Sequence, residues 1–207
     1  MGKRVMVMAG GTGGHVFPAL AVAEELGSRG MDAFWLGTPD SFEAGVVPGR
    51  GFTMEWISIQ GLRGKGWLRW LAAPFKIAAA MLQALRVVRR RRPQLVLGMG
   101  GFVTGPGGLV ARILGIPLVI HEQNAVPGMT NKWLARIADR VLEAFPGSFG
   151  AATGALVTGN PVRSEIAAIT VPEQRMAGRE GPLRLLVLGG SQGAQALNET
   201  LPQALAP

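Results

Sequence analysis

Along most of the chain, short continuous apolar runs alternate with longer segments that have the hydrophobic periodicity of a helix. Short runs in which every residue is apolar, such as Val5–Met8 and Leu118–Ile120, are typical of strands buried on both faces of a sheet. Further strands are predicted at 33–36, 54–59, 95–97, 140–142, 156–157 and 185–188, and helices at 18–26, 67–92, 109–114 and 131–137. Buried strands that alternate with helices predict an α/β fold, with a Rossmann-like parallel sheet and helices on both faces.

The start of the chain and a segment near its end share one local pattern. Val5–Met8 precedes GGTGGH at 10–15 and a helix, and Leu185–Leu188 precedes GGSQGA at 189–194 and a helix. The repeat predicts two similar α/β domains. Residues 160–183 contain three prolines and mixed charges, as in a linker. We therefore predict a first domain over 1–159, an interdomain linker over 160–183 and the truncated first βα unit of a second domain over 184–207. One βα unit cannot bury its own apolar face, so the chain is expected to fold through residue 159.

The charge is unevenly distributed. Basic residues outnumber acidic ones by 21 to 13, which favours a phosphate-rich partner such as nucleic acid, anionic lipid or a phosphorylated substrate. Ten of the 21 basic residues lie between Glu55 and Glu122, a stretch without Asp or Glu. The chain has no cysteine, which excludes disulfides, cysteine-ligated zinc and a thiol nucleophile. A signal peptide is not expected, because the first apolar run ends at a glycine cluster without a cleavage site.

The segment from Trp67 to Arg92 is predicted as one long helix, or as two helical pieces that meet at Pro74. Its internal charges and proline make it a poor transmembrane candidate. One apolar face must cover the sheet, and the remaining apolar width, rimmed by cations, suits an anionic bilayer surface. A buried helix whose cations extend to solvent is the alternative. The residues predicted to face the membrane are Leu71, Phe75, Lys76, Arg86 and Arg89.

Glycine-rich clusters at 10–14, 100–108 and 189–193 each follow a predicted strand. A glycine turn between a strand and a helix presents free backbone N–H groups and the positive end of the helix dipole, and both favour a phosphate. The first turn lacks the dinucleotide fingerprint, because Val16 stands where the third glycine would be. A lone glycine pair is more often only a tight turn. Three clusters in one chain favour ligand binding by at least two of them.

Two polar segments are candidates for chemistry. His15 stands at a predicted helix N-terminus, where the dipole disfavours imidazolium, so a neutral ring could act as a general base. A hydrogen-bonded turn histidine is the alternative. The second segment, His121–Asn124, follows a buried strand, where ligands of parallel sheets bind, and its side chains can grip sugar hydroxyls. The alternative is a capping sequence in which Asn124 starts the next helix.

Seven collinear motifs span nearly the whole chain. They are MVMAGGTGGHVFPA at 6–19, GLRGKG at 61–66, GMGGFVTGPGG at 98–108, HEQN at 121–124, TNKWLA at 130–135, GNPVR at 159–163 and GGSQGA at 189–194. Their combination resembles the N-acetylglucosaminyltransferases of bacterial cell-wall synthesis, which make lipid II from lipid I and UDP-N-acetylglucosamine. The resemblance implies the GT-B architecture, two Rossmann-like domains that face a cleft, with the acceptor and the membrane bound by the first domain.

The resemblance also implies roles for individual residues. The UDP-N-acetylglucosamine contacts would be Thr12, Gly13, Gly14, Asn124, Arg163 and Ser191. The acceptor diphosphate would lie at Gly100, Gly101, Thr104 and Gly105. The reaction would be an inverting displacement in which His15, or less favourably Glu122, removes the proton from the acceptor hydroxyl. Because the family extends beyond Pro207, the chain alone is expected to bind lipid diphosphate but to lack transferase activity and to bind UDP-N-acetylglucosamine weakly.

The expected partners are UDP-N-acetylglucosamine, lipid I, an anionic membrane surface and other cell-wall synthesis proteins, and not nucleic acid. We expect no cofactor and no metal bound by the protein, since no cluster of carboxylates is visible. The expected location is peripheral, on the cytoplasmic face of the bacterial inner membrane. Three other functions stay open: a non-catalytic membrane-docking subunit of a glycosyltransferase split over two chains, a UDP-sugar epimerase of the same fold, and a nucleic-acid-binding module. The last is the weakest, because no stacking aromatics interleave with the basic residues.

Overall fold

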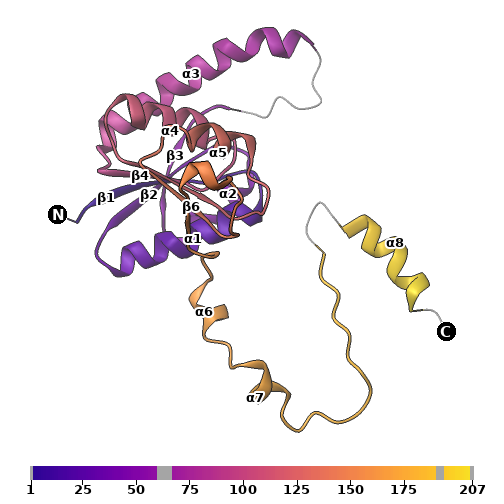
Figure 1. The fold of residues 1–207 in the computed structure, drawn as a ribbon. Coiled ribbons are helices and arrows are strands. Elements are labelled where there is room, and N and C mark those ends of the chain that lie inside the picture. The colour runs from indigo at the N-terminus through magenta and orange to yellow at the C-terminus, as the bar shows by residue number, and fades with distance from the viewer. Residues whose placement is uncertain (1, 60–66, 190–193, 206–207) are drawn as a thin grey trace. The chain divides into compact units, whose positions relative to one another are not determined.

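The computed structural model describes residues 2–59, 67–189 and 194–205 (Figure 1). The chain forms two compact units, Met1–Ala168 and Ile169–Pro207. The first unit holds a seven-stranded, entirely parallel sheet with the strand order β3-β2-β1-β4-β5-β6-β7. The strands are β1 (Arg4–Met8), β2 (Asp32–Gly37), β3 (Thr53–Trp56), β4 (Leu95–Gly98), β5 (Leu118–Glu122), β6 (Arg140–Glu143) and β7 (Leu156–Val157). The predicted parallel α/β fold is confirmed.

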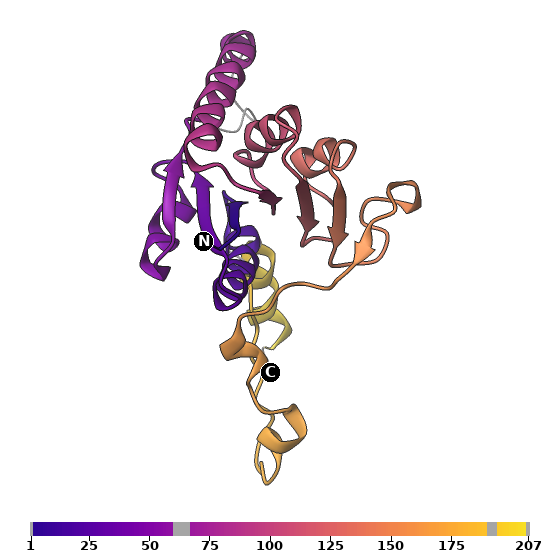
Figure 2. The same cartoon turned by 90° about the vertical axis from the view of Figure 1, so that its left-hand side faces the viewer.

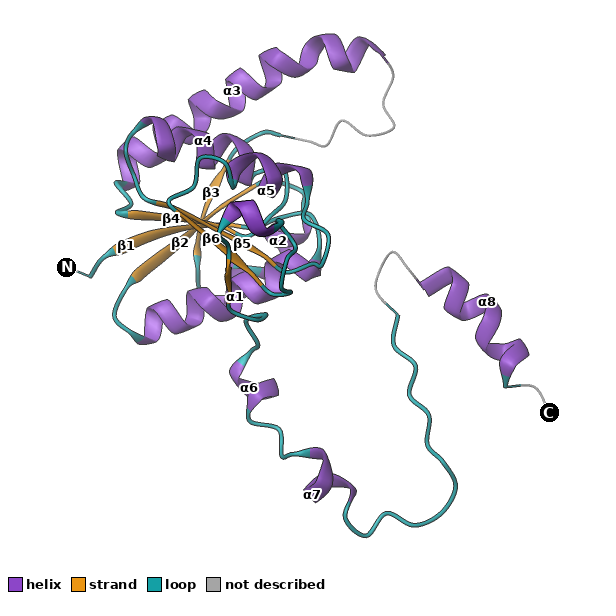
Figure 3. Cartoon of the chain, in the orientation of Figure 1, coloured by secondary structure: helices purple, strands orange, loops and turns teal. Residues whose placement is uncertain are grey.

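Helices cover both faces of this sheet (Figures 2 and 3). One layer contains α1 (Gly13–Ser28), which contacts the short helix α2 (Phe42–Val46) and is followed by β2. The other contains α3 (Trp67–Arg91), α4 (Thr104–Ile113) and α5 (Met129–Leu134), with α4 in contact with both neighbours. Two 3₁₀ turns, η1 (Pro48–Arg50) and η2 (Ala151–Thr153), and the short helix α6 (Ser164–Ala167) complete the unit.

The central strand β1 shows why the sheet needs both layers. Its side chains alternate between two separate cores: Met6 and Met8 belong to the core beneath α3, α4 and α5, whereas Val5 and Val7 belong to the core beneath α1. All four are at most 2% exposed. A strand flanked by β2 and β4 and buried on both faces must be apolar throughout, which is the pattern the sequence shows.

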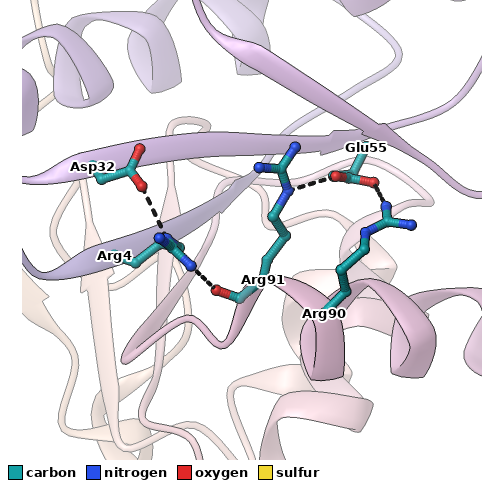
Figure 4. A network of polar contacts seen from close by, with 5 residues as sticks. All are labelled: Arg4, Asp32, Glu55, Arg90 and Arg91. Atoms are coloured by element: carbon teal, nitrogen blue, oxygen red, sulfur yellow. Dashed lines mark hydrogen bonds and ion pairs between the residues drawn. The ribbon is translucent and has the colours of Figure 1, made fainter.

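Helix α3 continues through Pro74 as a single helix of 25 residues. From Ala73 onward, where the structure describes the side chains of α3, the buried positions are Ala73, Ala80, Ala84, Val87 and Val88, which recur on one face. The C-terminal end of α3 is tied to the sheet by ion pairs, because both Arg90 and Arg91 contact the Glu55 carboxylate in β3 (Figure 4). Two cations of the basic stretch therefore already have an acidic partner.

The same network reaches the first residues of β1 and β2. The Arg4 guanidinium lies 2.9 Å from the Asp32 carboxylate and also donates a hydrogen bond to the Arg91 carbonyl oxygen (Figure 4). The Asp32 side chain is 59% exposed, so this pair adds little stability by itself. Its consequence is geometric, since it links the strand ends to the end of α3.

The second unit contains two helices among its described residues, α7 (Pro172–Met176) and α8 (Ala194–Ala204). The helix predicted after the glycine cluster at 189–193 is present as α8. The strand predicted at Leu185–Leu188 is absent, and three of its four side chains are at least 60% exposed. The described part of this unit contains no strand that could pair with Leu185–Leu188. The backbone N–H and C=O groups of this segment therefore have no neighbouring strand to hydrogen-bond with.

Candidate active site

Three loops meet at the carboxyl edge of the sheet, where the strand order reverses. β1 and β4 are neighbours in the sheet although β2 and β3 lie between them in sequence, and β5 follows beside β4. Ligands of open parallel sheets bind at such a reversal, outside the carboxyl ends of the strands. The loops that follow β1, β4 and β5, together with the first residues of α1 and α4 and the last residue of β5, contain most of the predicted site residues of the first unit.

The first glycine turn packs directly on the second through backbone atoms. The Gly10 N–H donates to the Gly100 carbonyl oxygen at 3.2 Å. Gly101 has φ +90°, and a Cβ atom there would lie 2.5 Å from the Gly10 carbonyl oxygen. Any side chain at Gly101 would force the two loops apart, so their close approach explains this glycine without reference to a ligand.

Buried glutamates anchor the loops at this edge, a feature that the sequence analysis missed. Glu43 is 1% exposed, and its carboxylate accepts hydrogen bonds from the N–H groups of Gly11 and Thr38. Glu143 is 4% exposed and accepts from the N–H groups of Gly147 and Phe149. Charged carboxylates that receive several backbone donors stabilise a loop and tolerate burial. Their positions at or after strand ends are a weak sequence signal, because exposed acids are equally common there.

Helix α1 begins at the first glycine turn, and the predicted donor-binding residues lie in its first residues. Thr12 is the N-cap with an extended backbone and no side-chain cap hydrogen bond. Gly13 and Gly14 follow as the first helical residues, whose N–H groups have no partner within the helix. A Cβ atom at Gly13 would lie 3.1 Å from the Phe17 ring. The Arg163 guanidinium lies 5.1 Å from the centre of the same ring, so Arg163 is brought close to the turn.

The glycine cluster after β4 divides into two parts with different tasks. Gly100 and Gly101 have positive φ and form the turn, whereas Thr104 begins α4 and its hydroxyl donates to the Gly100 carbonyl oxygen at 2.8 Å. Gly105, Gly107 and Gly108 lie inside α4. A Cβ atom at Gly107 would lie 2.3 Å from the Met8 sulfur. The predicted start of this helix at residue 109 was therefore five residues late, because glycines that permit close packing were interpreted as a loop.

The two catalytic candidates have very different surroundings. Glu122, in β5, is fully buried, and its carboxylate accepts from the Asn124 N–H and side-chain amide, the Gly128 N–H and the Asn131 amide, at 2.8–3.1 Å. His15 is only partly buried, and its Nδ1 lies 2.8 Å from the Gln123 amide oxygen. Asn124 is exposed at the start of the loop that Glu122 organises.

Two predicted residues cannot be placed in this way. Ser191 lies outside the described residues, and the side chain of Leu71 is likewise outside what the structure describes. The other four predicted membrane-facing residues are all exposed on α3: Phe75, Lys76, Arg86 and Arg89. Phe75 is 79% exposed, although phenylalanine is among the most strongly apolar side chains. No described helix is long and apolar enough to cross a membrane.

The fold and this loop arrangement define a Rossmann-like domain with a candidate binding site at the strand-order reversal. Residues 5–143 match the model of the glycosyltransferase family 28 N-terminal domain, and the chain belongs to this family. Over 206 residues it is 57% identical to a UDP-N-acetylglucosamine–N-acetylmuramyl-(pentapeptide) pyrophosphoryl-undecaprenol N-acetylglucosamine transferase from Methylococcus capsulatus, covering 100% of this chain and 57% of the relative. A transferase of the same name from Photobacterium profundum is 56% identical over 97% of this chain and 56% of its own length.

A solved structure gives the same result. The crystal structure of MurG from Acinetobacter baumannii is similar with a TM-score of 0.80 and 47% identity, over 98% of this chain and 57% of the MurG chain. The predicted family resemblance is confirmed. The chain spans somewhat more than half of the length of each of these three relatives, so the activity of a whole relative is considered below as a proposal.

Proposed function

We propose that the protein is an inverting glycosyltransferase of peptidoglycan synthesis, which transfers N-acetylglucosamine from UDP-N-acetylglucosamine to undecaprenyl-diphospho-muramoylpentapeptide (lipid I) and forms lipid II. The observation that carries the proposal is the position of His15, a partly buried imidazole at the N-terminal end of α1 beside the Gly100 turn. The 57% identity with the Methylococcus capsulatus transferase supports these substrates.

In the proposed reaction, His15 accepts the proton of an acceptor sugar hydroxyl, and the oxygen attacks C1 of N-acetylglucosamine. A bond forms between this oxygen and C1, the bond from C1 to the phosphate oxygen breaks with inversion, and UDP leaves with the electron pair. The N–H groups of the first turn of α1 and the Arg163 guanidinium stabilise the charge on the diphosphate. Thr12, Asn124 and Ser191 are further proposed contacts of UDP-N-acetylglucosamine.

The surroundings of Glu122 favour His15 as the base. A general base needs a free lone pair within reach of the substrate hydroxyl. The Glu122 side chain is fully buried, and both its oxygens accept hydrogen bonds from its own loop. We therefore assign Glu122 to holding the loop from Asn124 to Gly128 and linking it to Asn131 of α5. His15 takes the proton in this proposal.

The second glycine turn is the proposed site of the acceptor diphosphate, over Gly100, Gly101, Thr104 and Gly105. The Thr104 side chain is fully buried, and its hydroxyl already donates to the Gly100 carbonyl oxygen. The groups offered to a diphosphate are therefore the backbone N–H groups at the start of α4, where the helix dipole is positive. Gly100 also contacts the His15 ring, which would bring the acceptor close to the base.

The proposed membrane surface is the outer side of α3, α4 and α5. On α3, Phe75 and Leu82 are 79% and 54% exposed, and Lys76, Arg86 and Arg89 are exposed near them in sequence. The other two helices add large exposed apolar side chains, which the sequence analysis missed: Ile113, Met129 and Trp133 are each at least 62% exposed. An apolar surface with surrounding cations suits anionic lipid. We propose peripheral attachment at the cytoplasmic face of the inner membrane, with other cell-wall synthesis proteins as further partners.

The transfer proposal is tested by incubating labelled UDP-N-acetylglucosamine with lipid I. Because the chain spans 57% of its relative, the enzyme is a chimera that continues after Pro207 with the corresponding C-terminal part of the Methylococcus capsulatus transferase. We expect labelled lipid II, without any added cofactor and with chelator present. Binding of lipid I without transfer would instead indicate a membrane-docking subunit, and epimerised UDP-sugar in the absence of lipid I would indicate an epimerase.

The membrane proposal is tested by sedimentation of the 207-residue chain with anionic vesicles. We expect binding that high salt reverses, and that the double substitution Phe75→Glu and Leu82→Glu weakens by about tenfold or more, because two apolar contacts are replaced by repelled charges. The double substitution Val162→Glu and Ile166→Glu is the matched control, since these residues are 54% and 46% exposed and lie outside the proposed surface. Equal loss of binding in the control would show that net charge alone explains the effect.

A further inference from the structure

A chain of polar side chains links His15 to the place where the polypeptide leaves β7. The His15 Nδ1 lies 2.8 Å from the Gln123 amide oxygen, and the Gln123 amide nitrogen lies 3.0 Å from the His121 Nδ1. At the far end, the His121 Nε2 lies 3.0 Å from the Gly159 carbonyl oxygen. Three side chains from two segments that are 108 residues apart therefore form one continuous path to a backbone carbonyl.

The direction of this path follows from the bonds of the Gln123 amide. Its nitrogen also lies 3.1 Å from the His121 carbonyl oxygen, which can only accept a hydrogen bond. The NH₂ end of the amide must therefore face His121, and the oxygen end must face His15. An amide oxygen can only accept, so the His15 Nδ1 must carry the hydrogen. In a neutral ring the lone pair is then on Nε2, which has no hydrogen bond to any described residue.

His121, at the far end of the path, has the opposite tautomer to His15, with its hydrogen on Nε2. His121 is 3% exposed, and burial lowers its pKa below the ordinary value of 6.5, although the hydrogen bond to Gly159 and the charge of Glu122 act in the opposite direction. A neutral His121 that donates from Nε2 to Gly159 has its acceptor lone pair on Nδ1, where the Gln123 amide donates. Asn160 adds a second link, because its amide donates to the Gln123 carbonyl oxygen at 3.1 Å.

Backbone also limits the position of the His15 ring. Gly100 has φ +105°, and a Cβ atom there would lie 2.6 Å from the His15 Nδ1. The ring therefore lies against the second glycine turn while its Nδ1 contacts Gln123. A fixed ring position and a fixed hydrogen are what a general base requires before substrate arrives.

We propose that Gln123 is a positioning residue, which together with His121 holds His15 in the Nδ1–H tautomer and so directs the Nε2 lone pair to the acceptor hydroxyl. This inference rests on the proposed role of His15 as the base. The Nδ1–H form is the less favoured tautomer of a free neutral histidine, so its presence would need the specific partner that Gln123 supplies.

The test is nitrogen-15 NMR of the two imidazoles in the 207-residue chain, at a pH where both rings are neutral. The chain contains only two histidines, and His121→Gln identifies which signals belong to His15. We expect opposite tautomers: the hydrogen on Nδ1 in His15 and on Nε2 in His121. Because no substrate is present, this result does not depend on whether the transferase proposal is correct. An Nε2–H tautomer at His15 would overturn the inference and would leave the transfer assay unaffected.

Two substitutions of Gln123 make the test sharper. Gln123→Met keeps the length of the side chain, but its thioether sulfur is only a weak acceptor, so His15 should change to the Nε2–H form as its majority tautomer. Gln123→Glu still accepts from His15 but cannot donate to His121, so His15 should keep its tautomer. Gln94→Met is the control, because the Gln94 amide oxygen also accepts one backbone hydrogen bond, from Arg4, at the opposite end of the sheet. A His15 tautomer that is the same in Gln123→Met and the native chain would overturn the role of Gln123.

Discussion

The two glycine-turn segments begin with similar sequences and have different structures. Val5–Met8 forms a strand between β2 and β4 and is almost completely buried, whereas Leu185–Leu188 forms no strand and its leucines are 60–79% exposed. Both are runs of four apolar residues followed by a glycine pair. An apolar run is therefore compatible with a buried strand, but the strand forms only where neighbouring strands are available to pair with it. A strand needs a ladder for its backbone and two covered faces for its side chains.

The largest predicted difference in stability comes from placing one negative charge in each of the two segments, 5–8 and 185–188. Val7→Asp puts a carboxylate into the core beneath α1, where Val7 is fully buried, and should lower the free energy of unfolding of the first unit by about 4 kcal/mol or more. Leu186→Asp, at a position that is 79% exposed, should change it by less than about 0.5 kcal/mol. Urea unfolding followed by circular dichroism measures both. Similar losses in the two variants would mean that Leu186 is buried in solution.

The second prediction concerns the residue that ends each turn, which is His15 in the first and Ala194 in the second. In the chimeric transferase, His15→Ala should reduce kcat by roughly a hundredfold or more with little change in the affinity for UDP-N-acetylglucosamine, because it removes the proton acceptor. Adding Ala194→His to this variant tests whether a histidine in the other glycine-turn segment can replace His15, and we expect no recovery of kcat. A loss of tenfold or less would transfer the role of base to Glu122.

The third prediction weakens the first site without removing its base. Gln123→Met in the chimera should lower kcat by about tenfold, because the favoured tautomer of His15 then presents a hydrogen instead of a lone pair from Nε2. KM for UDP-N-acetylglucosamine should change little, which separates positioning from loss of a binding contact. Gln123→Glu should retain more activity than Gln123→Met, and Gln94→Met should have native kinetics. Equal losses in all three variants would indicate general destabilisation.

The fold was largely predictable from the sequence, and the errors of the prediction have a common cause. Apolar runs predict the strands of the parallel sheet, because strands that are covered on both faces must be apolar. The start of α4 was missed because Gly107 and Gly108 resemble a loop. Their lack of side chains serves close contacts with Met8 and Leu134, which are distant in sequence and invisible to local patterns.

The candidate site was predictable only in part, and for the same reason. His15 was identified by its place at a predicted helix N-terminus, and the HEQN segment by its place after a buried strand. The partnership of His15 with Gln123 joins residues 108 positions apart, and no periodicity indicates it. The burial of Glu122, which favours an anchoring role, depends on four donors, three from the loop that follows β5 and one from Asn131 of α5. Chemistry at strand ends can thus be located from the sequence, while the division of tasks among neighbouring polar residues requires the structure.

The smallest predicted effect also distinguishes the two units, because both histidines lie in the first. Burial lowers the pKa of His121 from its ordinary value of 6.5. As the pH falls through 6.5, the unfolded chain takes up a proton at this residue before the folded chain does, so the free energy of unfolding decreases. The decrease stops below the folded-state pKa, and each unit of lowering corresponds to about 1.4 kcal/mol.

Urea unfolding between pH 7.5 and 5.5, above the range in which ordinary carboxyl groups protonate, isolates this contribution. His121→Gln, whose amide can still donate to the Gly159 carbonyl oxygen, should remove most of the pH dependence, whereas His15→Gln should retain it. An unchanged dependence in His121→Gln would show that another group takes up the proton.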